Sequence, residues 1–162
     1  AEKIIGRLAE QLAQLSAQRA EIEAEILTVV DAHPLTRVLT SMPGVGVRSA
    51  ARILTEVVGK DFADAGHLAS YAGIAPVTRR SGTSIRGEHP ARGGNKHLKR
   101  AMFLAAFAAL HDPTSRAYYD RKRGQGKKHN AALICLARRR CDVLYAMLRD
   151  GTLYQQKTPA AA

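Results

Sequence analysis

The chain has 162 residues and a formal net charge of +11, with 25 lysines and arginines against 14 aspartates and glutamates. This length suits one domain with a modest core plus an appended element, and the basic surplus favours a polyanionic partner. The longest apolar run, Ala101 to Leu110, is too short to span a bilayer, and no signal peptide is visible. Cys135 and Cys141 lack metal or redox spacing, which predicts reduced thiols in a cytoplasmic compartment.

Residues 1–33 are acidic, with six acidic residues against three basic ones. A 3,4 spacing runs through Ile5, Leu8, Leu12, Leu15, Arg19, Ile22, Ile26 and Val29. This heptad pattern predicts a coiled-coil linker helix that pairs with another chain or with a helix outside this sequence. A helix packed on its own domain is the alternative. The helix should end at His33-Pro34, because proline disfavours helical geometry in the preceding residue.

Helical patterns also dominate residues 34–154. We expect helices over 35–41, 47–58, 65–72, 96–110, 113–123 and 130–149. Asn95 and Asp112 are predicted N-caps, and the helix over 96–110 should be buried nearly all round. No segment alternates convincingly with period two, so the basic stretch 79–95 is expected to be a loop. The prediction is an all-α chain with a heptad helix, a compact helical domain over 34–154 and a disordered tail over 155–162.

Residues 39–53, LTSMPGVGVRSAARI, have the pattern of a helix–hairpin–helix. Gly44 and Gly46 permit a tight turn and a close approach to another surface. The free amides at the start of the next helix form a phosphate-sized anion site, to which Arg48 can add a charge-assisted contact. We predict binding to a nucleic-acid backbone here, with a purely structural hairpin as the alternative.

Positive charge is concentrated in residues 79–140, which hold sixteen basic residues and three acidic ones. Ser81 follows Arg79 and Arg80, and Arg86 comes five residues later. Guanidinium groups can hold a phosphodiester and stabilise the charge of a phosphoryl-transfer transition state, so serine attack on a DNA phosphate is conceivable. By spacing alone, Ser84 is an equal candidate, and an ordinary loop serine is the alternative.

Other basic residues are predicted to contact nucleic acid: Arg92, Lys96, Lys99, Arg100, Arg121, Lys122, Arg123, Lys127 and Lys128. Tyr118 and Tyr119 could stack on bases, although core packing is expected for at least one. The triplet 138–140 sweeps around most of a helix circumference, so at least one arginine should face inward or meet a partner. The six histidines have no ligand spacing, and no metal site is predicted.

Four segments in order resemble the C-terminal half of bacterial insertion-sequence transposases of the IS-one-ten/IS-eleven-eleven type. They are SMPGVGVRSAARILTEVVG, HLASYAGIAPVTRRSGTSIRG, RGGNKHLKRAMFLAAFAAL and DVLYAMLRDGTLY. The resemblance covers nearly all of residues 39–154, and the acidic heptad helix resembles the coiled-coil linker that precedes this domain. Each segment alone is unspecific, but the ordered combination is specific.

This resemblance implies an enzyme that cuts and rejoins DNA, with a serine in a Ser-Gly context that matches Ser81. It also implies an absent acidic N-terminal domain that holds Mg²⁺, so this chain should have no cofactor of its own and be inactive alone. DNA, a guide RNA and a second copy of the chain are the implied partners, in the bacterial cytoplasm at the nucleoid. A non-catalytic helix–hairpin–helix module that binds DNA or RNA is the alternative.

Overall fold

The computed structural model describes residues 2–81 and 84–156, and in this part of the chain it holds seven α-helices, one 3₁₀ helix and one β-hairpin. The helices are α1 (Glu2–Asp31), α2 (Pro34–Thr40), α3 (Val47–Val57), α4 (Ala65–Tyr71), α5 (Lys96–Ala108), α6 (Pro113–Gly124) and α7 (His129–Asp150), with η1 at Ala109–His111. The all-α prediction is confirmed. None of the described helices is long and apolar enough to cross a membrane.

Local signals set the helix boundaries. The Asn95 side chain accepts hydrogen bonds from the backbone amides of His97 and Leu98, and Asp112 accepts one from Ser115 at 2.8 Å. Both predicted N-caps are therefore confirmed. Pro34 begins α2, and Gly151, with φ 62°, ends α7 in the left-handed conformation that favours glycine.

The core lies where α5 and α7 pack against each other and against α3, α4 and α6. Its largest fully buried side chains include Leu39, Ile53, Leu68, Leu98, Leu133 and Leu136. Buried alanines on these helices let their backbones approach closely. The expectation that α5 is buried nearly all round is wrong, because Leu104 and Phe107 are 48% and 52% exposed.

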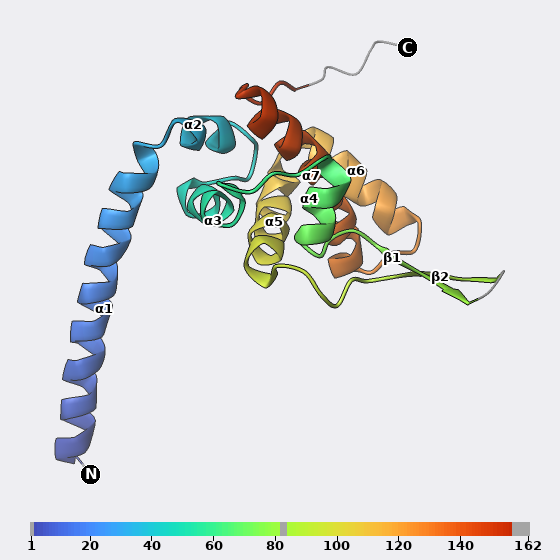
Figure 1. Cartoon of the computed structure of the whole chain (residues 1–162). Coiled ribbons are helices and arrows are strands. Elements are labelled where there is room, and N and C mark those ends of the chain that lie inside the picture. The colour runs from blue at the N-terminus through green and yellow to red at the C-terminus, as the bar shows by residue number, and fades with distance from the viewer. Residues whose placement is uncertain (1, 82–83, 157–162) are drawn as a thin grey trace.

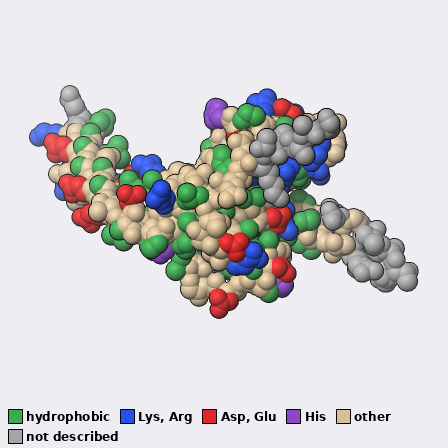
Figure 2. All heavy atoms as spheres, turned by 90° about the horizontal axis from the view of Figure 1, so that it is seen from above, with side chains coloured by type: hydrophobic (Ala, Val, Ile, Leu, Met, Phe, Trp, Pro, Cys, Tyr) green, Lys and Arg blue, Asp and Glu red, His purple; other side chains and the backbone are tan. Residues whose placement is uncertain are grey.

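Helix α1 projects from this body (Figure 1). Its main contacts with the body are with α2 and α3, near its C-terminal end. Its heptad residues Leu8, Leu12 and Leu15 are 59%, 68% and 62% exposed. Figure 2 shows hydrophobic side chains along this projecting helix. Every apolar residue of the heptad pattern is at least half exposed, so the predicted seam does not pack on the chain's own domain.

The predicted loop over 79–95 is wrong for residues 79–81 and 84–89. Strands β1 (Val77–Ser81) and β2 (Ser84–His89) pair antiparallel and extend away from the helices (Figure 1). The register pairs Val77 with His89, Arg80 with Ile85 and Ser81 with Ser84, and it shifts between Thr78 and Arg80. The hairpin escaped prediction because its sequence lacks the alternation of apolar and polar residues that marks a half-buried strand.

Candidate nucleic-acid interface

The hairpin carries the predicted catalytic and phosphate-binding residues. Arg79, Arg80 and Ser81 lie on β1, and Arg86 lies on β2. Ser81 and Ser84 are directly opposite each other at the end of the ladder, beside Gly82 and Thr83, which lie outside the described residues. The register shift is typical of a β-bulge, a feature that bends a strand and re-aims its side chains.

The hairpin is fixed at its root by close backbone contacts. Gly73 follows α4 and Gly94 precedes α5, and both have positive φ, 66° and 90°. A Cβ on Gly94 would lie 2.5 Å from the backbone nitrogen of Gly73. The Asn95 amide donates to the Tyr71 carbonyl at 2.7 Å. These contacts bring the two chain segments that lead into and out of the hairpin together.

The Asn95 side chain strengthens this root. While its oxygen caps α5, its Nδ2 donates to the Tyr71 hydroxyl at 2.9 Å and to Glu56 Oε2 at 2.6 Å. One side chain therefore links α3, α4 and α5 at the base of the hairpin. The sequence indicated the cap but gave no signal for the other two bonds.

The predicted helix–hairpin–helix residues lie elsewhere. The α2–α3 turn and the hairpin occupy different sides of the body (Figure 1). Gly44, with φ 79°, packs against α5 and η1, where an added Cβ would lie 2.4 Å from the Ala105 carbonyl oxygen. Gly46 is exposed and has open space around it. The glycine that needs its missing Cβ thus makes an internal contact, and the anion site predicted at this turn stays a prediction.

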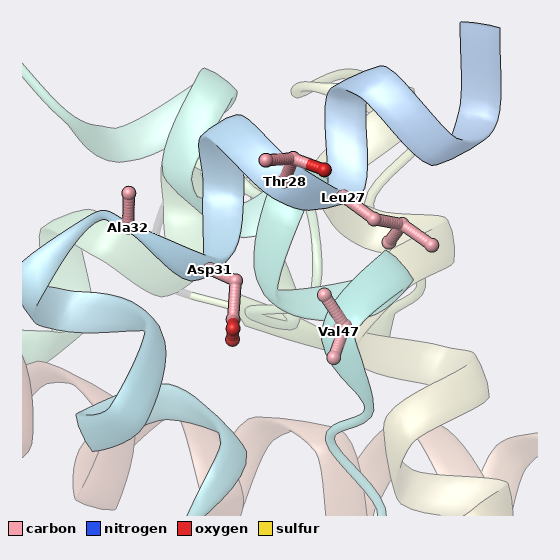
Figure 3. Close-up of a pocket in the computed structure, with 5 residues that line it drawn as sticks. All are labelled: Leu27, Thr28, Asp31, Ala32 and Val47. Carbon is pink, nitrogen blue, oxygen red and sulfur yellow. The ribbon is translucent and has the colours of Figure 1, made fainter. Parts of the chain in front are cut away.

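Arg48 at the start of α3 bonds to Glu23 Oε2 of α1 at 2.8 Å. Its side chain is 76% exposed, so this pair contributes little to stability and leaves donors for another ligand. An open hollow of about 580 Å³ lies beside it, lined by Leu27, Thr28, Asp31, Ala32 and Val47 (Figure 3). Asp31 is its one charged lining residue, which makes this hollow unsuited to a phosphate.

The remaining predicted cations lie around the first turn of α5 and the connection between α6 and α7. Arg92, Lys96, Arg100, Arg121, Arg123, Lys127 and Lys128 are exposed, and Lys99 and Lys122 are half-buried. Lys99 Nζ donates to the Ala91 carbonyl at 3.0 Å, and an Arg123 guanidinium nitrogen donates to the Lys127 carbonyl at 2.8 Å. These cations are available to an anionic partner, and their predicted role stays a prediction.

The arginine triplet on α7 divides as expected. Arg140 is 5% exposed and donates to the Pro43 carbonyl, whereas Arg139 is exposed. Burial lowers the pKa of Arg140 from its ordinary value. Its Nε has no hydrogen-bond partner among the described residues. Arg140 therefore holds the α2–α3 turn against α7.

The two tyrosines also separate. Tyr119 is buried and its hydroxyl lies 2.7 Å from His129 Nδ1, whereas Tyr118 is half-buried beside several cations.

Burial raises the pKa of the Cys141 thiol to about 12, so it is an inert core thiol and not a nucleophile. No group of three or more histidine, cysteine, aspartate or glutamate side chains in the described ranges could hold a metal ion.

The sequence of this chain is similar to those of several known proteins. The model of the transposase IS116/IS110/IS902 family matches residues 36–120. The 43.6 kDa protein of insertion element IS110 from Streptomyces coelicolor is 58% identical over 159 residues, which are 97% of this chain and 39% of that protein. The 42 kDa protein of insertion element IS900 from Mycobacterium paratuberculosis is 40% identical, over 100% of this chain and 41% of that protein.

A pilin gene-inverting protein from Moraxella bovis is 29% identical over 123 residues, which are 74% of this chain and 38% of that protein. The chain thus spans less than half the length of each of these relatives. The matched region includes the whole hairpin and its root, because residues 36–120 run from α2 into α6.

Proposed function

Because the chain belongs to the transposase IS116/IS110/IS902 family, we propose that it is the part of a DNA transposase or recombinase that binds nucleic acid and supplies Ser81 as the nucleophile. The observation that carries this proposal is the projecting hairpin, whose outer end pairs Ser81 with Ser84 and whose strands carry Arg79, Arg80 and Arg86. A hairpin that extends from the body can reach a DNA backbone that the helices do not enclose.

The proposed chemistry is a phosphodiester exchange. The Ser81 oxygen forms a bond to phosphorus, the bond from phosphorus to one sugar oxygen breaks, and the serine proton ends on that leaving oxygen. Nearby guanidinium groups stabilise the additional negative charge of the transition state. The covalent serine–DNA linkage is itself a phosphodiester, so the energy of the broken bond is conserved. A second DNA strand end can therefore attack the linkage and rejoin the DNA.

We propose, from the family resemblance alone, that acidic residues that bind Mg²⁺ lie in the remainder of the intact protein. This stretch alone would then bind DNA, and a guide RNA where one is used, without cleaving either. The exposed seam of α1 would pair with a second copy and bring two hairpins to one DNA site.

The test is Ser81→Ala in the intact protein, with Ser84→Ala as the matched control. We expect Ser81→Ala to lower strand transfer by at least about a thousandfold, because no other atom forms the covalent ester. Binding of the DNA substrate, measured by gel shift, should be unchanged.

Loss of strand transfer in Ser84→Ala alone would identify Ser84 on β2 as the nucleophile. Full activity in both variants would favour the alternative, a non-catalytic module that binds nucleic acid. The cation-rich connection between α6 and α7 supports that alternative.

A further inference from the structure

A groove of about 680 Å³ opens between the root of the hairpin and helices α5, α6 and α7. Apolar side chains line part of it, among them Ile74, Pro76 and Ile134. Among its described lining residues, five are cations, namely Lys99, Lys122, Lys127, Arg138 and Arg139, and one is a carboxylate, Asp142. A volume of about 300–1,000 Å³ is usual for small-ligand sites, so the groove fits a nucleotide and not a duplex.

Tyr118 organises the positive charge of this groove. The guanidinium carbons of Arg139 and Arg121 lie 4.8 Å and 5.1 Å from the centre of its ring, and Lys122 Nζ lies 5.6 Å from it. The negative face of an aromatic ring attracts cations. An arginine stacked on a ring keeps its in-plane N–H donors for an anion. Tyr118 thus holds three mutually repelling cations together.

Among the described side chains, the carboxylates of α6 and α7 form their ion pairs with other arginines. Asp120 on α6 pairs with Arg116 at 3.0 Å, and Asp142 on α7 pairs with Arg138. Lys122 Nζ donates to the neutral Gln125 side chain at 3.1 Å. The charge gathered at Tyr118 is therefore available to an external anion that also has an apolar, planar part.

We propose that this groove binds one unpaired nucleotide of a nucleic-acid strand, which rests on the nucleic-acid-binding function proposed above. Its phosphate contacts Arg139 and Lys122, and its base lies against Tyr118 and the apolar lining. The groove selects against paired bases, since a base inside a duplex cannot enter it. The site would hold a strand next to the hairpin without reading a particular sequence.

Photo-crosslinking tests the position of the base. The probes are a short oligodeoxythymidine carrying one 5-iodouracil, its oligouridine counterpart, and the same DNA with the modified base paired in a duplex. Irradiation with the 162-residue chain should label the peptide that contains Tyr118 for the single strands and not for the duplex. Labelling confined to other peptides would overturn the proposal, and the stronger single-strand probe assigns the site to DNA or to RNA.

Affinity measurements by fluorescence anisotropy supply the second readout. Tyr118→Leu should weaken single-strand binding about tenfold, because one stacked base is lost, and leave duplex binding unchanged. Ala131→Phe adds bulk inside the groove without a charge change and should also weaken single-strand binding. Ala117→Phe on α6, outside the lining, is the matched control and should not. Equal melting temperatures show that both variants fold.

Arg139→Gln should lower the slope of log affinity against log salt by about 0.7 for single strands, as expected for one lost phosphate contact. Arg37→Gln, an exposed arginine on α2, is the charge-matched control. If groove variants and controls behave alike, the groove assignment fails while the proposed function stands. If the unaltered chain binds no nucleic acid at all, both fail.

Discussion

Gly94 and Asn95 show how two adjacent residues can fix the position of a projecting hairpin. Asn95 joins three helices through its side chain. Gly94 allows the backbone to lie against Gly73, at a φ that side chains rarely adopt. A Cβ added to the preceding Gly93 would meet no heavy atom within 4 Å. Alanine substitutions at Gly93 and Gly94 therefore compare a methyl group that meets open space with one that meets backbone atoms at this root.

We expect Gly94→Ala to lower the free energy of unfolding by at least about 2 kcal/mol, because a methyl group would meet backbone atoms that cannot move away. Gly93→Ala should change it by less than about 0.5 kcal/mol. Urea unfolding followed by circular dichroism measures both. Equal values for the two variants would contradict the close packing of Gly94 on Gly73.

At the scale of elements, α1 exposes an apolar seam that its own domain leaves uncovered. Leu12 and Leu15 are 68% and 62% exposed, and their neighbours in the heptad pattern are similar. Exposed apolar rows of this length are costly in water unless another helix covers them. A second copy of α1 would cover the row at matching positions.

Leu12→Glu should convert an oligomer into a monomer, because each charge would have to be buried in the seam. Light scattering after gel filtration gives the mass of each species. Gln14→Glu adds the same charge to the same helix off the seam and should leave the mass unchanged. If the unaltered chain is a monomer, the partner of the α1 seam is a helix other than a second copy of α1.

The elements differ in how far the sequence predicts them. The helices were predictable because an apolar period near 3.6 marks most of them, and the caps Asn95 and Asp112 mark where α5 and α6 begin. The hairpin was not, because Thr78, Arg80 and Ser81 carry no apolar alternation. The groove could not be predicted either, since Tyr118 and Arg139 meet only after α6 and α7 pack. Adjacent lysines and arginines in the sequence indicated a nucleic-acid partner but not where charge and ring would combine.

The whole molecule separates its charge along its length. Acidic residues predominate in α1, whereas residues 79–140 carry sixteen basic residues against three acidic ones. Cations in this second region surround the hairpin root and the α6–α7 connection. An anionic partner should therefore approach the body from the hairpin side, and α1 should stay free for another helix.

Duplex DNA binding by the 162-residue chain should weaken about tenfold or more as salt rises over a modest range, because each neutralised phosphate releases a counterion. Isothermal titration at several salt concentrations measures the slope. Binding that is insensitive to salt would contradict a phosphate-dominated interface.

Helix α7 also contacts both the groove beside Tyr118 and the α2–α3 turn. Its consecutive residues Arg139 and Arg140 serve different sides, since one stacks on Tyr118 beside the groove and the other holds the Pro43 carbonyl. Because the two arginines are adjacent on one helix, the groove and the α2–α3 turn are tied to the same point of α7. That turn leads into α3, which α1 contacts, so a shift of α7 at this point would also move the base of the projecting helix.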